Sequence, residues 1–259
     1  MEVIVLASGS SGNSLLVRAG GSEFLVDAGL SARKLESRIR EAGSDPARLA
    51  GILLTHEHSD HASAVCVFSK KWEVPVYSNS STARAICDAK AAGEIRWRLF
   101  ETGARFEVAG VGVRSFSVPH DAADPVAFRI EEADTAFAVL TDLGYVTRLI
   151  VESLRGVRGM LLETNYDGTL LEKDTRRPWS VKQRITSRHG HLSNADAANL
   201  LAQVDAPELS TIILGHLSRD CNCPQLAAGV ITNCFAGRAK IPRVHCAGQD
   251  AASPVFAIT

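Results

Sequence analysis

The stretch LLTHEHSDH, residues 53–61, places three histidines and two carboxylates directly after an apolar run. A strand ending here would direct His56 and His58 to one side, and the turn into a following helix would aim Asp60 and His61 at a neighbouring point. The spacing therefore permits two adjacent metal positions. A polar loop with surface histidines is the alternative, and the density of ligand types argues against it.

Further ligand types follow three later apolar runs. A single histidine in such a place is more often structural than ligating, but three candidate ligands in the same topological position argue together. They are His120 after residues 111–118, Asp142 after residues 136–140, and His216 after residues 211–214.

This order, H-x-H-x-D-H and then His, Asp and His at successive strand ends, resembles the metallo-β-lactamase superfamily over essentially the whole chain. The resemblance implies an α/β (α+β) fold, a four-layer αβ/βα sandwich with the site at one edge of both sheets. It implies two divalent metal ions bridged by Asp142, and the N and O ligands suit Zn²⁺ or Mn²⁺. The implied ligands are His56, His58 and His120 for the first metal and Asp60, His61 and His216 for the second.

Two such metals would generate hydroxide from water at neutral pH and neutralise charge on a phosphoryl or carbonyl oxygen. Asp60 is also the candidate to accept the proton of the attacking water. Asp27, in FLVDAG (24–29), matches the first motif of the superfamily. We expect it to orient the histidine loop, with a plain helix-entry aspartate as the equal alternative.

Composition limits the class of protein only broadly. The 259 residues carry 28 basic and 29 acidic side chains, so a nucleic-acid surface must be local rather than global. No apolar run approaches the roughly 20 residues of a membrane-spanning helix, and the opening run is too short for a signal peptide. We expect one domain over 1–259, a cytoplasmic location, no membrane, and six reduced cysteines rather than a disulfide framework.

Short apolar runs and helix-period stretches alternate along both halves of the chain, which favours packed sheets covered by helices. Helices are predicted over 32–42, 60–68, 80–92, 145–154 and 194–204. Strands are predicted over 3–6, 15–17, 24–26, 51–54, 111–118, 126–130, 136–140, 160–162, 211–214, 243–245 and 254–258.

Residues 175–195, TRRPWSVKQRITSRHGHLSNA, contain no carboxylate. Such a basic stretch suits contacts to a nucleic-acid backbone, with a solvated basic face as the alternative. Ser193 opens a Ser-x-x-Asp capping box, whose helix would present N–H groups to a phosphate beside His191 and Arg188. A helix cap alone is the alternative.

GHLSN, ASGSSGNS, PHDAADPVAF and GQDAASPVFAI are together similar to the YycJ/WalJ-like branch of the superfamily. The resemblance implies a 5′-to-3′ exonuclease on double-stranded DNA, with repair or replication proteins as partners. His191 would then stabilise the transition state or protonate the leaving oxygen, and Ser193 and Asn194 would contact phosphate. The alternatives are a hydrolase of small esters, thioesters or lactones, an RNA-processing nuclease, or a non-enzymatic redox or metal-binding scaffold.

The loop ASGSSGNS, residues 7–14, lacks the lysine and the spacing of a mononucleotide-binding loop. Ser11 and Asn13 are candidates for contacts to a substrate phosphate, and a turn in which Asn13 binds its own backbone is the alternative. Two features depart from the branch. Tyr166 stands where members of the branch tend to have histidine. Cys221 and Cys223 stand where polar residues are expected, and a pair of thiolate metal ligands is the alternative for them.

Overall fold

Residues 1–90, 95–238 and 240–259, which the computed structural model describes, form two seven-stranded sheets in the orders β14-β1-β2-β3-β4-β5-β6 and β13-β12-β11-β10-β9-β8-β7. The strands are β1 (Glu2–Ala7), β2 (Ser14–Ala19), β3 (Ser22–Val26), β4 (Ile52–Leu53), β5 (Val76–Ser78), β6 (Trp97–Leu99), β7 (Arg105–Val108), β8 (Val111–Ser117), β9 (Val126–Glu132), β10 (Thr135–Leu140), β11 (Gly159–Glu163), β12 (Thr211–Gly215), β13 (Arg243–Cys246) and β14 (Phe256–Ala257).

Alternate side chains of one strand are buried on opposite faces of its sheet. Val3 and Val5 of β1 pack between the two sheets, whereas Ile4 and Leu6 pack toward the helices. A strand that is buried on both faces requires an apolar residue at nearly every position. This requirement explains the continuous apolar runs of the sequence.

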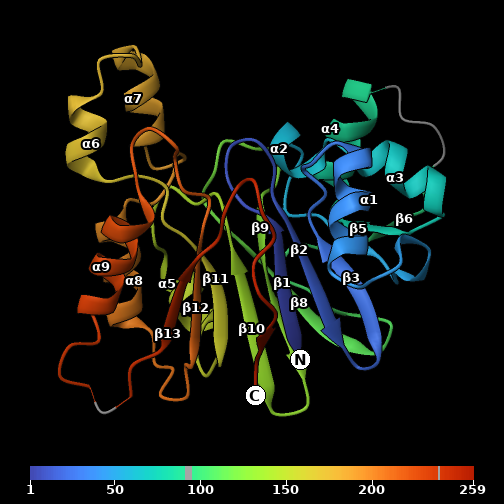
Figure 1. Cartoon of the computed structure of the whole chain (residues 1–259). Coiled ribbons are helices and arrows are strands. Elements are labelled where there is room, and N and C mark those ends of the chain that lie inside the picture. The colour runs from blue at the N-terminus through green and yellow to red at the C-terminus, as the bar shows by residue number, and fades with distance from the viewer. Residues whose placement is uncertain (91–94, 239) are drawn as a thin grey trace.

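Helices cover the outer face of each sheet (Figure 1). The helices are α1 (Ala32–Glu41), α2 (Ser59–Ala62), α3 (Val65–Trp72), α4 (Ser80–Lys90), α5 (Arg148–Ser153), α6 (Gly168–Lys173), α7 (Trp179–Ile185), α8 (Asn194–Gln203) and α9 (Pro224–Asn233), with a 3-10 turn at Pro46–Arg48. Helices α1, α3 and α4 pack on the first sheet, and α5, α8 and α9 pack on the second. The predicted four-layer α/β sandwich is confirmed.

Each of the two sheets has a parallel half and an antiparallel half. Strands β3 to β6 and β10 to β13 are parallel, and both sets of carboxyl ends lead into the loops that carry the candidate ligands. The C-terminal strand β14 pairs with β1, so the two chain ends lie side by side (Figure 1). None of the described helices is long and apolar enough to cross a membrane.

Several predicted elements differ from the observed ones. The helix predicted over 60–68 is divided into α2 and α3, and the helix predicted over 145–154 begins only at Arg148, where Thr147 caps α5. Helix α4 matches the prediction over 80–92 to Lys90, and the last two positions lie outside the described residues. Strands β5, β6 and β7 and helices α6, α7 and α9 were not predicted; β5 and β6 have three residues each, and α7 buries none of its side chains.

Candidate metal centre

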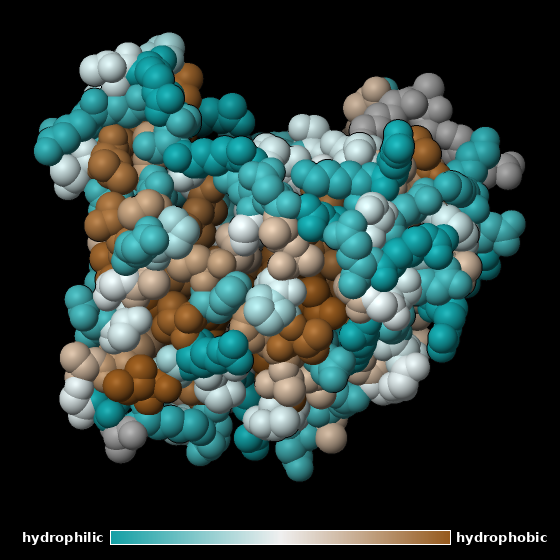
Figure 2. Space-filling view, viewed as in Figure 1, coloured by the Kyte–Doolittle hydropathy of each residue, from teal (hydrophilic) through white to brown (hydrophobic). Residues whose placement is uncertain are grey.

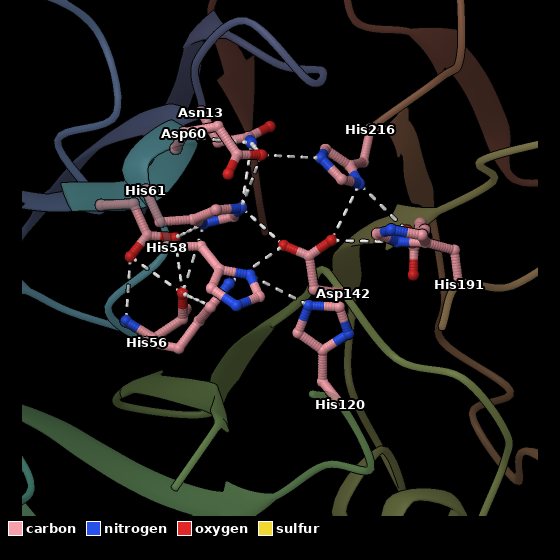
Figure 3. Close-up of polar contacts among 12 residues, drawn as sticks. Asn13, His56, His58, Asp60, His61, His120, Asp142, His191 and His216 are labelled. Atoms are coloured by element: carbon pink, nitrogen blue, oxygen red, sulfur yellow. Dashed lines mark hydrogen bonds and ion pairs between the residues drawn. The ribbon is translucent and has the colours of Figure 1, made fainter. Parts of the chain in front are cut away.

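The candidate ligands come from loops at the ends of strands in both sheets. The first sheet supplies the loop after β4, in which His58 precedes the short helix α2 and Asp60 lies in its first turn. The second sheet supplies His120 after β8, Asp142 after β10 and His216 after β12. The structure thus brings together all seven ligands that the sequence predicted (Figure 3).

His56, His58 and His120 form one candidate metal group, whose ligand atoms all lie within 4.8 Å of one another. Nε2 of His120 is 3.3 Å from Nδ1 of His58. Nε2 of His56 is 3.5 Å from Oδ2 of Asp142. Three imidazoles therefore converge next to one carboxylate, an arrangement that fits a zinc or manganese ion.

Asp60, His61, Asp142 and His216 form a second group with the same closeness. Nε2 of His61 is 2.5 Å from Oδ2 of Asp142, and Nε2 of His216 is 3.2 Å from Oδ2 of Asp60. Asp142 lies at the centre of Figure 3, beside ligands of both groups. One carboxylate oxygen, Oδ2, thus lies within 3.5 Å of a ring nitrogen of each group.

Three of the residues in this centre adopt left-handed backbone conformations. Asp27, Asp142 and His216 have φ values of 63°, 54° and 56°, and each follows the end of a strand. Aspartate and histidine are among the residues that tolerate this region best. Each of these strained residues lies where the chain leaves a sheet and enters the site, and such strain is common at functional sites.

Each candidate ligand histidine has a hydrogen-bond partner outside the candidate ligand set. For four of the five this partner is on the ring nitrogen that faces away from the other candidate ligands, whereas Nδ1 of His216 also lies 3.0 Å from Oδ1 of Asp142. Such partners fix the tautomer and the direction of a ligating imidazole. The pairs are His56 with the Thr55 hydroxyl, His58 with the Asp121 carbonyl, His61 with Asp27, His120 with the Gly190 carbonyl, and His216 with Glu163.

Asp27 lies where it can orient the histidine loop, as the sequence suggested. Its Oδ2 accepts from Nδ1 of His61 at 2.7 Å, and Oδ1 accepts from the backbone N–H of Thr55 at 2.9 Å. The Thr55 hydroxyl also donates to this carboxylate. Asp27 orients one ligand directly and, through Thr55, contacts the ring of His56.

Glu163 was not predicted. It ends β11, is fully buried, and its Oε1 accepts from Nδ1 of His191 at 2.7 Å and from Nδ1 of His216 at 3.0 Å. Because Nδ1 of His191 is engaged with Glu163, its Nε2 is left to face the cavity. An acidic residue directly after the apolar run 160–162 was the signal that could have identified Glu163, since it repeats the position of the other ligands.

The buried polar atoms of the centre match a site for cations. Nε2 of His56 and both carboxylate oxygens of Asp142 are buried without a well-directed hydrogen bond, although nearly all buried polar atoms in proteins have one. The donor set of five imidazoles and two carboxylates fits divalent ions of intermediate softness. On both grounds the residues fit a pair of such ions.

Burial and neighbouring charges shift the pKa values of several groups in the centre. Burial, followed by the charge of His61, holds the pKa of His56 well below its usual range. Burial also opposes the charge on His61, but the carboxylates of Asp142 and Asp27 outweigh it and raise the pKa of His61 to about 10. Burial opposes ionisation of Asp142 as well, yet His216 and His61 hold its pKa well below the usual value. Asp142 is thus a carboxylate at neutral pH, as a ligand must be.

A cavity of about 230 Å³ opens on the candidate ligands. One wall is α7, which contributes Val181, Arg184 and Ile185, and His191 and Ser10 also line the cavity. Figure 2 shows the molecule hollowed between the α6–α7 lobe, at the upper left, and the rest of the upper rim. A substrate could therefore reach the ligands from the side of this lobe.

Ser11 and Asn13 do not occupy equivalent places. Ser11 is exposed and donates to Oε1 of Gln249 at 3.0 Å, whereas Ser10 lines the cavity. Asn13 is buried, and its Oδ1 accepts from the backbone N–H of Gly9 at 2.8 Å. The amide oxygen of Asn13 is thus engaged within its own loop, as in the turn that was the alternative, whereas its Nδ2 reaches Asp60 and His61.

Ser193 and Asn194 do not line the cavity. The Ser193 hydroxyl accepts from the backbone N–H of Asp196 at 3.0 Å and caps α8. Asn194 is buried and exchanges side-chain hydrogen bonds with Asn222. Both side chains are engaged within the protein, as the helix-cap alternative requires. Arg188 is exposed and stacks on the ring of Tyr145, with the guanidinium carbon 4.3 Å from the ring centroid.

Carboxylates from outside the basic stretch 175–195 pair with several of its arginines. Arg177 contacts Asp174 at 2.6 Å and Asp220 at 2.9 Å. Arg176 also contacts Asp220, and Arg184 contacts Asp121 at 2.7 Å. Folding therefore neutralises much of the positive charge that is continuous in the sequence.

Comparison with known proteins assigns the family. A family model of the beta-lactamase superfamily domain matches residues 22–216, most of the chain. The chain belongs to the metallo-β-lactamase superfamily. Within this superfamily it is 36% identical over 261 residues to "Exodeoxyribonuclease WalJ" of Streptococcus pneumoniae, an alignment that covers 98% of this chain and 97% of the relative. It is 38% identical over 226 residues to "Exodeoxyribonuclease YycJ" of Bacillus anthracis, covering 86% of this chain and 84% of the relative.

Solved structures of the superfamily share the fold. The metallo-β-lactamase fold protein YhfI of Bacillus subtilis superposes with a TM-score of 0.76, 14% identity and 99% coverage of both chains. At this identity the likeness concerns the architecture alone. The comparison agrees with the four layers described above.

The two departures from the superfamily branch lie beside the site rather than in it. Tyr166 is buried with Leu171 and Cys221 in a small cluster under α6 and does not line the cavity. The Cys221 thiol contacts Arg177 and Asp174, and no disulfide joins any of the six cysteines in the described residues. In the described residues, no candidate metal group includes a cysteine.

Proposed function

We propose that the protein is a metal-dependent exodeoxyribonuclease that removes nucleotides from double-stranded DNA in the 5′-to-3′ direction. The observation that carries this proposal is the identity to exodeoxyribonuclease WalJ along nearly the full length of both chains. The clustering of seven candidate ligands, five of which line one cavity, supports it, because phosphodiester hydrolysis by two cations needs such a set.

The ligands would hold two divalent cations, with Zn²⁺ and Mn²⁺ as the candidates. When bound, the cations supply Lewis-acid chemistry, which offsets charge on a phosphoryl group and makes water easier to deprotonate. His56, His58 and His120 would hold one cation and Asp60, His61 and His216 the other. Asp142 would contact both.

Asp60 and His191 would move the protons. The Asp60 carboxylate lines the cavity and would accept a proton from the attacking water. His191 lines the same cavity, with Nδ1 held by Glu163, and its Nε2 would give a proton to the leaving oxygen. Because acid and base act at one cavity, a phosphodiester could contact both at once.

The DNA strand would extend from the cavity along the α6–α7 lobe. Arg188 and the exposed Ser11 are the candidates for contacts to its phosphates, since neither is paired with a carboxylate in the described part of the chain. Such a substrate implies a cytoplasmic location and proteins of DNA repair or replication as partners.

A substrate panel tests the proposal. Protein loaded with Mn²⁺ or Zn²⁺ is incubated with 5′-phosphorylated duplex DNA, single-stranded DNA, RNA and a chromogenic ester. We expect nucleotide release from the duplex to be fastest, and Asp60→Asn to abolish it. Faster release from RNA would instead favour an RNA-processing nuclease, and ester turnover without nucleotide release would favour a small-molecule hydrolase.

A further inference from the structure

The loop between β1 and β2 connects ligands that come from different sheets. The Ser8 hydroxyl accepts from the backbone N–H of His216 at 2.8 Å and donates to Oδ1 of Asn13 at 3.2 Å. The backbone N–H of Asn13 donates to the Asp60 carbonyl at 2.7 Å, and its side-chain Nδ2 lies 3.0 Å from Nε2 of His61. Hydrogen bonds of Ser8 and Asn13 therefore connect the backbone of His216 to the backbone of Asp60.

This loop fits its surroundings without free space. Ser8 and Asn13 are 1% and 4% exposed. A Cβ atom added to Gly29 would lie 1.6 Å from the Asp60 carbonyl oxygen and 2.7 Å from the Asn13 nitrogen. The backbones of these three residues are thus in direct contact, and a shift of the loop would be transmitted to Asp60.

The loop contacts only one of the two ligand groups. In the ranges that the structure describes, the hydrogen bonds of Ser8 and Asn13 reach Asp60, His61 and His216 but none of the three histidines of the first group. The outer nitrogens of that first group are held by Thr55, Asp121 and Gly190 instead. Thr55 contacts ligands of both groups and Asp27 a ligand of the second, whereas Ser8 and Asn13 support the second group alone.

We propose that Ser8 and Asn13 are positioning residues for the second cation and set the separation of Asp60 and His216 before that cation binds. The two ligands belong to different sheets, and their approach of 3.2 Å between Oδ2 and Nε2 otherwise depends on how the sheets pack. A site held in its binding geometry avoids part of the cost of ordering its ligands. This inference rests on the ligand assignment and not on the identity of the substrate.

Metal titration tests the proposal without any substrate. The binding of Zn²⁺ is followed by calorimetry and by metal analysis, and the binding of Co²⁺ by its visible absorption, in wild type, Ser8→Ala and Asn13→Ala. We expect the first equivalent to bind as in wild type and the second about 10- to 100-fold more weakly, the usual effect of losing a partner of a ligand. The Co²⁺ absorption of the second equivalent should change accordingly.

Matched variants separate positioning from general damage. Ser11→Ala alters an exposed hydroxyl of the same loop that contacts Gln249, and both equivalents should bind as in wild type. Ser8→Thr keeps the hydroxyl and should bind the second metal equivalent with nearly the affinity of the wild type. If the alanine variants do not fold, Asn13→Gln, which displaces the amide by one methylene, should weaken the second equivalent alone. Equal weakening of both equivalents, or no weakening of the second, would overturn the proposal.

Discussion

Glu163 accepts a hydrogen bond from Nδ1 of His191 at 2.7 Å and thereby directs the other nitrogen of the ring into the cavity. The second carboxylate oxygen of Glu163 accepts from the backbone N–H of Leu143 at 2.8 Å. Glu163 is fully buried, so these contacts fix its position. The direction of the His191 ring is thus set by the end of β11.

The first prediction follows from this pair. His191→Ala should lower kcat by about 10²- to 10⁴-fold, the usual contribution of a general acid, and Glu163→Gln should lower it less. In the His191→Ala background and at equal metal content, Glu163→Gln should have little further effect on kcat, because its remaining contact, to His216, acts on metal binding rather than on proton transfer. Steady-state kinetics with metal content as a control checks this; equal and additive losses would show that Glu163 acts independently of His191.

The second prediction concerns the shared carboxylate. Asp142→Asn keeps a residue type that tolerates the left-handed backbone at this position, so the fold should survive. It removes the charge next to both ligand groups, so affinity for both metal equivalents should fall by more than about 100-fold, the upper range for an outer partner of a ligand. Metal analysis after dialysis measures the loss. Retention of one full equivalent would contradict a shared role.

The third prediction concerns the packing beneath the centre. Gly29→Ala would place a methyl group 1.6 Å from the Asp60 carbonyl oxygen, so the backbone must move. We expect a loss of about 3 kcal/mol or more in the free energy of unfolding, at the upper end for overpacking. Urea denaturation measures it. As the control, Gly229→Ala in α9 meets no atom within 4 Å and should stabilise the protein by up to about 1 kcal/mol.

The fourth prediction separates free from paired arginines. Arg188→Ala should weaken DNA binding and reduce the slope of log affinity against log salt by about 1, because one phosphate contact is lost. Arg176→Ala should leave the slope unchanged, since Arg176 is paired with Asp220 at 2.7 Å. Binding to a catalytically inactive variant, measured over a range of salt concentrations, checks both. An equal change for the two variants would contradict the distinction.

The candidate ligands could be identified in the sequence because each follows an apolar strand, and these strands could be predicted because both of their faces are buried. The short α2 and the separate α3 could not, since the break at residues 63 and 64 depends on tertiary hydrogen bonds such as that from Ala64 to the Ala28 carbonyl. Helix α7 was missed because it buries no side chain and so carries no apolar periodicity.

The phosphate-side residues were less predictable than the ligands. The capping box at Ser193 was identified from its spacing, but the sequence does not show that Asn222 would engage the side chain of Asn194. The basic stretch likewise has no carboxylate within its own sequence. In the fold, however, Asp121 and Asp220 from distant loops pair with its arginines. Such long-range pairing is set by tertiary contacts rather than by local pattern.

Release of nucleotides from duplex DNA tests the central claim most directly. A 5′-phosphorylated duplex is incubated with metal-free protein, metal-loaded protein and metal-loaded Asp60→Asn, and the products are identified by mass and by the end from which they come. We expect mononucleotides from the 5′ ends with the metal-loaded wild type alone. Hydrolysis of a small ester by the metal-loaded wild type, with the duplex left intact, would contradict the account.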